Sequence, residues 1–166
     1  MTKQHKLKLE DLENPAKKEE VGKSVHEHLL SGGTMQDVLG YTDEMLATRY
    51  NEARDHFMRE DFEKAAEGFS YLAALNHYEA KYWQSLGTTQ MHWGDVVSAI
   101  NSYTIATATD PTNPESLYYA ARCFMDLGDT EEALNALQGV VEIAKAGGHK
   151  YRPLEDKAQE LLNTLK

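Results

Sequence analysis

The stretch that decides the fold is WQSLGTTQMHWGDVVSAINSYTIATATDP, residues 83–111. Two small residues, Gly87 and Ala99, lie on either side of Gly94, and the stretch closes on Pro111. A glycine followed by an aspartate ends one helix and caps the next, and proline cannot continue a helix. The stretch therefore predicts two helices joined by a tight turn.

The spacing of this unit recurs along the chain. Ala53, Gly87 and Ala121 lie 34 residues apart. The same offset relates three further sets: Ala65, Ala99 and Ala133; Phe69, Tyr103 and Leu137; Phe62, Val96 and Thr130. Self-similarity at a fixed period is the signature of a repeat architecture. The chain therefore carries three copies of one unit, from about Leu46 to Val141.

A 34-residue period with these small, aromatic and proline positions resembles the tetratricopeptide repeat, a helix-turn-helix unit. The middle copy matches the pattern at Trp83, Leu86, Gly87, Gly94, Ala99, Tyr103, Ala106 and Pro111. Gly87 and Ala99 have almost no side chain, so the two helices of the unit can approach closely. We predict an all-α fold in which three tetratricopeptide repeats form a short superhelix, with an N-terminal helical region and a C-terminal capping helix.

Both flanks of the repeats also have helical periodicity. Val21, Val25 and Leu29 recur every four residues and form a narrow apolar stripe. Because an isolated helix of this kind is marginal alone, we expect the stripe to form a homodimer contact. The predicted regions are a flexible N-terminus at 1–13, an N-terminal helical dimerisation region at 14–41, the three repeats at 42–148 and the capping helix at 149–166.

Composition limits the classes of partner. The chain has 166 residues, 41% of them hydrophobic, and a formal net charge of −10. Its apolar runs are too short for a membrane helix and its first residues are too polar for a signal peptide. An acidic surface disfavours nucleic acid and anionic membranes, and a lone cysteine, Cys123, suits a reducing compartment. We expect a cytosolic protein with neither nucleic acid nor membrane as its partner.

The sequence offers no credible catalytic residue. Gly22-Lys23-Ser24 resembles the end of a phosphate-binding loop, but that loop requires a glycine where this chain has Lys17. His26 and His28 are two residues apart, so on a helix they cannot share a metal ion. We therefore predict a protein that is not an enzyme and needs no metal and no cofactor.

The first helix of each repeat offers a second face, which looks into the concave side of the superhelix. The residues at these places are Tyr50, Arg54, Phe57, Met58, Gln84, Thr88, Met91, Tyr118, Arg122 and Met125. Two tyrosines, a phenylalanine and three methionines suit a groove for a peptide with hydrophobic anchors, whereas a solvated face would carry Lys and Glu. The alternative is that these are ordinary half-buried helix positions. If they form a groove, truncating Tyr50 and Phe57 affects binding more than folding.

A clamp for acidic C-termini, a familiar use of three such repeats, does not fit this groove. That clamp needs Lys and Asn at first-helix places where this chain has Tyr50 and Arg54. It needs a further Lys where this chain has Glu115. An extended apolar segment therefore suits the groove better than an acidic terminus.

Three segments carry a closer resemblance: GGTMQDVLGYTDEMLATRYNEA, residues 32–53; AALNHYEAKYWQSLG, residues 73–87; and AARCFMDLGDTEEALNAL, residues 120–137. They are similar to the class II chaperones of bacterial type III secretion systems. The resemblance implies a chaperone of the bacterial cytoplasm that serves virulence and forms homodimers. It also implies that the chaperone holds hydrophobic translocator proteins, through an extended N-terminal segment of each, until they are secreted. The alternative is a tetratricopeptide scaffold that joins folded subunits of a bacterial assembly.

Overall fold

The computed structural model describes residues 15–165, so the N-terminus predicted as flexible, residues 1–13, lies outside it. The described chain begins with α1 (Pro15–Leu30) and the short α2 (Met35–Leu39). Three helix pairs follow: α3 (Asp43–Met58) with α4 (Phe62–Leu75), α5 (Ala80–Trp93) with α6 (Val96–Thr109), and α7 (Glu115–Asp126) with α8 (Thr130–Ala146). A 3-10 turn, η2 (Gly148–Tyr151), leads into α9 (Arg152–Leu165). Each pair is one 34-residue copy, which confirms the predicted all-α repeat architecture.

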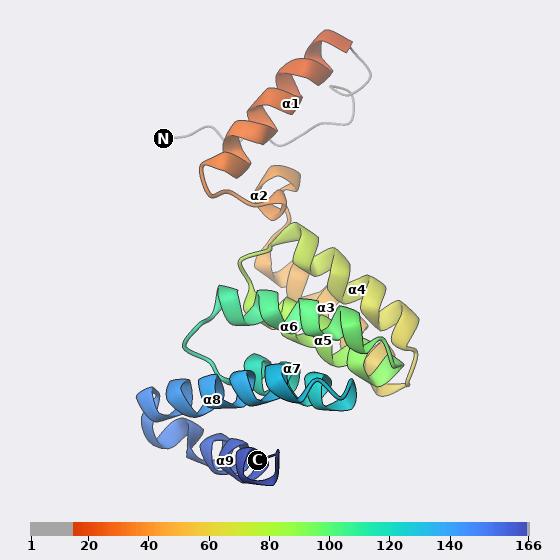
Figure 1. Ribbon diagram of the computed structural model, residues 1–166. Helices are drawn as coiled ribbons and strands as arrows, with labels where there is room; N and C mark the ends of the chain where they lie inside the picture. The colour runs from red at the N-terminus through yellow and green to blue at the C-terminus, as the bar shows by residue number, and fades with distance from the viewer. Residues whose placement is uncertain (1–14, 166) are drawn as a thin grey trace.

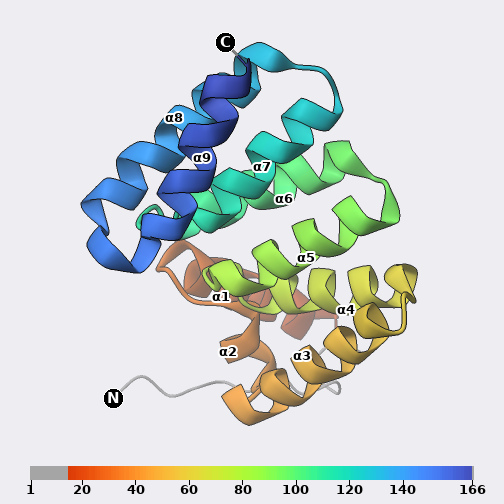
Figure 2. The same cartoon turned by 90° about the horizontal axis from the view of Figure 1, so that it is seen from below.

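The pairs stack into two layers. Each helix from α3 to α9 packs against the next one along the chain. Figure 2 shows α3, α5 and α7 following one another as one layer, with α4, α6 and α8 as the other. In Figure 1 the stack runs from α3 and α4 to α8 and α9. The first helices of the three repeats therefore share one side of the superhelix.

The small residues of the repeat lie where the paired helices meet. Ala65, Ala99 and Ala133 are completely buried. A side-chain carbon added to Gly87 would lie 3.0 Å from the ring of Tyr103, which is itself fully buried. The small residues recur every 34 residues because each copy contains the same close contact between its two helices.

The turns within the repeats follow the local signals of the sequence. Gly94 and Gly128 take left-handed backbone conformations, with φ of 90° and 76°. Asp95 and Asp129 then cap α6 and α8 by accepting the backbone N–H of the residue three positions on. In the first copy, which lacks this glycine, Glu60 takes the left-handed conformation instead, with φ of 61°. The turn geometry is therefore kept even where a side chain makes it less favourable.

The final helix covers the end of the superhelix, as the sequence predicts. Ala158 and Leu162 of α9 are buried in a cluster with Leu137 and Val140 of α8 and Ala121 of α7. The third repeat would otherwise expose these apolar side chains, because α9, and not a further repeat, packs on α8 in the described chain. The remaining apolar residues of α9 pack at the margin of the cluster: Leu154, Leu161 and Leu165.

A different arrangement holds the N-terminal region. In Figure 1, α1 projects away from the stacked helices and is joined to them through α2. Helix α2 packs against α4, and Gln36 fixes the junction by donating to Asp43 (2.7 Å) and accepting from Asn76 (3.0 Å). The stripe of Val21, Val25 and Leu29 is half-buried, and Leu30 at the end of α1 is 75% exposed. Helix α1 therefore carries apolar surface away from the body of the repeats.

Asp37 makes the start of α2 sensitive to acid. Its carboxylate accepts hydrogen bonds from the hydroxyl (2.7 Å) and the N–H (2.8 Å) of Thr34. These bonds, with a smaller contribution from His28, hold the pKa of Asp37 below its ordinary value. A carboxyl with a depressed pKa stabilises the fold above its unfolded pKa, about 3.9, and this contribution is lost as the pH falls through the folded pKa.

We therefore expect Asp37→Asn to be less stable than the parent at neutral pH and nearly as stable in strong acid. The asparagine keeps the size of the side chain but offers no carboxylate charge. Amide hydrogen exchange in α2, measured along a pH series, checks this. An equal difference in stability between the two proteins at every pH would contradict this expectation. The control is Asp156→Asn, on α9, and the same pH profile for this variant would also contradict it.

Candidate functional site

The predicted groove residues lie on α3, α5 and α7, the layer of first helices. Seven of the ten side chains are half-buried: Tyr50, Phe57, Gln84, Thr88, Met91, Tyr118 and Met125. The other three are exposed: Arg54, Met58 and Arg122. Tyr50 and Phe57 are seven residues apart, so they share one face of α3. The face combines half-buried apolar groups with cationic side chains at its surface.

Tyr50 joins the first repeat to the second. Its hydroxyl is 3.0 Å from the Ser85 hydroxyl on α5, and its ring lies 6.1 Å from that of Tyr82. The ammonium group of Lys81 sits 3.8 Å from the centre of the Tyr50 ring, a cation–π distance. A hollow of about 190 Å³ opens beside these groups, lined by Asp43, Ala47, Tyr50, Asn51, Glu79, Lys81 and Tyr82.

The sequence reasoning missed Lys81, Tyr82 and Ser85 as neighbours of the groove. A signal was present, because Lys81 precedes Gln84 by three residues and so shares its helix face. Burial, with the nearby acidic groups of Glu79 and Asp43, raises the pKa of Tyr82 above its ordinary value. Its phenol is therefore a neutral hydrogen-bonding group at physiological pH.

Phe57 forms a second aromatic contact between the same repeats. Its ring meets the imidazole of His92, on α5, edge to face at 5.3 Å, and the ring of Phe62, on α4, at 5.7 Å. His92 in turn stacks on Phe62 at 6.1 Å. The contact lies at the ends of α3 and α5, whereas Tyr50 lies nearer their beginnings. The two aromatic contacts therefore sit at different places along the same pair of helices.

Tyr50 and Phe57 also contribute to packing. The Tyr50 ring is 5.4 Å from that of Phe69, which is 2% exposed, and both Tyr50 and Phe57 pack against the core of the first repeat. Their aromatic area is therefore not separate from the packing. Each side chain has one part in the core and another at the surface, because the groove floor and the first-repeat core are the two sides of one helix.

The second and third repeats are linked by polar groups. The Gln84 amide donates to the carboxylate of Glu115, on α7, over 3.3 Å. Thr88 accepts from the buried hydroxyl of Tyr103 over 3.0 Å, so this groove residue also anchors α6. Tyr118 meets Tyr119 edge to face at 5.7 Å. This half of the face is more polar than the first-repeat half, which carries Tyr50 and Phe57.

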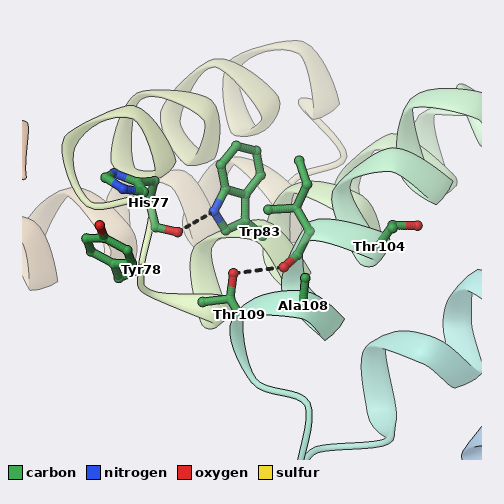
Figure 3. Close-up of a pocket in the computed structure, with 7 residues that line it drawn as sticks. His77, Tyr78, Trp83, Thr104, Ala108 and Thr109 are labelled. Carbon is green, nitrogen blue, oxygen red and sulfur yellow. Dashed lines mark hydrogen bonds between the residues drawn. The ribbon is translucent and has the colours of Figure 1, made fainter. Parts of the chain in front are cut away.

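A second, larger hollow lies on another side of the molecule. Its volume is about 650 Å³, and Figure 3 shows it between the α4–α5 loop and α6. The Trp83 indole N–H donates to the His77 carbonyl over 3.0 Å and thereby closes one wall. The lining is His77, Tyr78, Trp83, Thr104, Ile105, Ala108 and Thr109. Because α6 belongs to the layer of second helices, this hollow is not part of the predicted groove.

The groups that could carry chemistry are not arranged for it. Burial raises the pKa of the Cys123 thiol to about 11, so it stays protonated at neutral pH and is a poor nucleophile. Within residues 15–165, His, Cys, Asp and Glu side chains form no group of three that could hold a metal ion. No helix in that range is both long and apolar enough to cross a membrane.

The sequence relatives agree with the repeat architecture. A family model of the tetratricopeptide repeat matches residues 93–151. The low calcium response locus protein H of Yersinia pestis is 25% identical to this chain over 138 residues, an alignment that covers 83% of this chain and 82% of that protein.

Solved structures show the same fold. A T3SS complex from Aeromonas hydrophila superposes with a TM-score of 0.82 at 24% identity, covering 86% of this chain and 95% of its own. PcrH of Pseudomonas aeruginosa, bound to the chaperone binding region of PopD, superposes with a TM-score of 0.71 at 25% identity. The superposition covers 76% of this chain and 94% of PcrH. SycD of Yersinia enterocolitica, a type III secretion translocator chaperone solved as an alternative dimer, gives 0.69 at 24% identity over 75% and 93%.

Proposed function

We propose that this chain, a tetratricopeptide-repeat protein similar in sequence and fold to type III secretion translocator chaperones, binds hydrophobic translocator proteins and keeps them soluble and competent for secretion. PcrH, one of the similar proteins, is solved with the chaperone binding region of PopD and also with that of PopB. For this chain we assign the binding of an extended N-terminal segment of the translocator to the face formed by α3, α5 and α7.

The position of Tyr50 and Phe57 carries the proposal. Both rings are half-exposed on one face of α3, and both bridge to α5. An extended chain crossing this face can place one apolar side chain beside each ring, about two helical turns apart. Aromatic groups held by their neighbours lose little conformational freedom on binding, which suits them as anchors. The alternative, that these are ordinary half-buried positions, predicts instead that their removal costs stability and leaves binding intact.

The surrounding residues add adaptability and polarity. Met58 and Met91 can adjust to different apolar side chains, because methionine is unbranched and flexible. Lys81, over the Tyr50 ring, and Arg54, exposed on the same helix, can meet carbonyl or carboxylate groups of a bound chain. We infer that the groove selects an extended apolar segment and tolerates variation in its sequence.

The other parts of the chain complete this assignment. We assign residues 14–41 to dimerisation, 42–148 to the peptide-binding repeats and 149–166 to the cap. The proposed role is binding alone, without catalysis or a cofactor, in the bacterial cytoplasm, where translocators are made. A membrane-active cargo would aggregate or insert prematurely without a partner, and an acidic chaperone opposes both.

Co-expression with candidate translocators tests the function. The candidates are proteins from the same genome that carry one or two long apolar segments. We expect the candidate to be insoluble alone and to co-purify as a soluble complex with this chain. The matched control is Ile105→Ser, on α6 and outside the groove, which should co-purify the cargo as well as the parent does. If the candidates are equally soluble without this chain, the chaperone function is wrong.

The stripe on α1 predicts the oligomeric state. Val25→Asp places a charge in the middle of the stripe. We therefore expect the dissociation constant of the dimer to be at least tenfold higher for this variant than for the parent. Sedimentation velocity over a concentration series measures this. The control is Ser24→Asp, which adds the same charge at the neighbouring exposed position. An unchanged sedimenting mass for Val25→Asp, at a concentration where the parent is dimeric, would show that the stripe is not the contact.

A further inference from the structure

The three turns that join the helices of each repeat form one edge of the superhelix. They comprise residues 58–64, 92–97 and 126–132, and we call them the turn edge. Figure 2 shows them succeeding one another along the same side of the molecule. Four large apolar side chains are exposed there: Met58 (72%), which is also one of the predicted groove residues, Trp93 (52%), Val97 (61%) and Leu127 (52%). Large apolar groups gathered on an otherwise polar surface commonly mark an interaction site.

The turn edge is also strongly acidic. It carries eight carboxylates against two cationic side chains, Arg59 and Lys64. The acidic residues are Glu60, Asp61, Glu63, Asp95, Asp126, Asp129, Glu131 and Glu132. Asp61 is engaged by Lys64 at 3.2 Å and by His56 at 3.1 Å, so the local cations are already partly matched. The edge therefore combines apolar contact area with an excess of negative charge.

This edge is continuous with the groove. Phe57, a groove residue, precedes Met58 and contacts His92, which precedes Trp93. On the other side of the second turn, Met91 and Val96 pack against one cluster with Phe124 of α7. The turn edge therefore begins where the groove residues of α3 and α5 end.

We propose that the turn edge is a second docking surface for the cargo, which binds an amphipathic helix whose apolar face is bordered by Lys or Arg. This inference rests on the proposed chaperone function. Charge decides the occupant, because a cationic segment meets eight carboxylates. At this edge, a second copy of this chain would set the same acidic surface against the eight carboxylates and is repelled, as are anionic membranes and nucleic acid.

The two tryptophans of the chain provide a local readout. Trp93 lies on the turn edge, 52% exposed, whereas Trp83 lies in the separate hollow beside α6. The probe is an 18-residue amphipathic helix of leucine and lysine, added to the full chain labelled with ¹⁵N. We expect the indole N–H resonance of Trp93 to shift and that of Trp83 to stay in place. A matched peptide of leucine and glutamate should shift neither.

Variants separate the apolar from the charged contribution. The double variant Trp93→Ser with Leu127→Ser should bind the leucine–lysine peptide at least tenfold more weakly than the parent does. The double variant Asp126→Asn with Glu131→Gln should lower the affinity for this peptide about threefold at low salt and reduce the salt dependence of that affinity. The matched controls lie elsewhere and should change the affinity less than twofold: Tyr78→Ser with Ile105→Ser for the apolar pair, and Asp156→Asn with Glu160→Gln for the charged pair.

Binding that shifts Trp83 instead of Trp93 overturns the proposal. The proposal is also overturned if the control variants weaken peptide binding as much as the turn-edge variants do, since that result would indicate attraction to the net charge alone. These outcomes leave the proposed function standing if a translocator still co-purifies. If no translocator co-purifies with the parent, the proposed function fails by a separate measurement. The resonance shift is read on the unaltered protein, so the test does not depend on the folding of a variant.

Discussion

Replacing Tyr50 and Phe57 together by alanine should weaken the binding of a cargo peptide by about 2–4 kcal/mol, the range of anchor residues at the centre of an interface. The peptide is the extended segment of the translocator that co-purifies with this chain. Both rings are half-exposed on one face of α3, so their removal takes apolar contact area from the groove floor. Isothermal titration calorimetry with the parent and the double variant measures the loss.

The same variant should also unfold at a lower temperature, because both rings pack against the first-repeat core. A second pair of variants therefore separates the two roles. Tyr50→Phe keeps the ring on Phe69 and removes only the hydroxyl that meets Ser85, so it should retain most of the affinity. Phe69→Leu alters the core beneath the groove and should lower the melting temperature while leaving the affinity within about twofold.

The interpretation of these residues as ordinary core positions makes the opposite forecast. On that interpretation the double variant loses much of its stability and binds the peptide as well as the parent does, at a temperature where both are folded. That combination would show that the groove is not the binding surface. A loss of affinity in Phe69→Leu as large as in the double variant would likewise contradict the assignment, since the core alone would then set the affinity.

Gly87→Leu should destabilise the fold by about 3 kcal/mol, through overpacking at a close contact between the two helices of the second repeat. An added side-chain carbon at Gly87 meets two carbons of the Tyr103 ring at 3.0 Å. The ring cannot move aside easily, because Tyr103 is fully buried and its hydroxyl donates to Thr88. The backbones of α5 and α6 must therefore separate, and the contacts along both helices weaken.

Urea unfolding followed by circular dichroism measures this destabilisation. The control is Gly22→Leu, at a helical glycine of α1 that has open space within 4 Å of the added carbon. There leucine should leave stability unchanged or raise it slightly, since leucine favours the helix more than glycine does. If both variants unfold at the midpoint of the parent, close packing is not what sets the 34-residue spacing.

The sequence by itself determined the repeat period and the positions of the turns and helix caps. The period places Gly87 opposite Tyr103, and the turn signals at Gly94 and Gly128 end their helices where the structure ends them. Asp95 and Asp129, which follow these glycines, act as caps in the structure as well. These features are readable because each depends on residues within a few positions, or on an offset that is constant along the chain.

The sequence also identified the face of each first helix but not what its side chains touch. Periodicity assigned Tyr50 and Phe57 to the concave side. Only the tertiary structure showed that Tyr50 reaches Phe69 below it and Ser85 and Lys81 beside it. Those contacts depend on the angle and offset between neighbouring repeats, which packing sets and which no single helix encodes.

The turn edge illustrates the same limit. Met58, Trp93 and Leu127 lie at least 34 residues apart, and each is an unremarkable apolar residue at a helix end when read along the chain. Stacking of the three repeats brings their turns to one side, where the side chains and eight carboxylates become a single surface. The sequence determined the unit and its local geometry, whereas the superhelix decided which surfaces those units build together, because neighbouring copies must bury their apolar faces against each other.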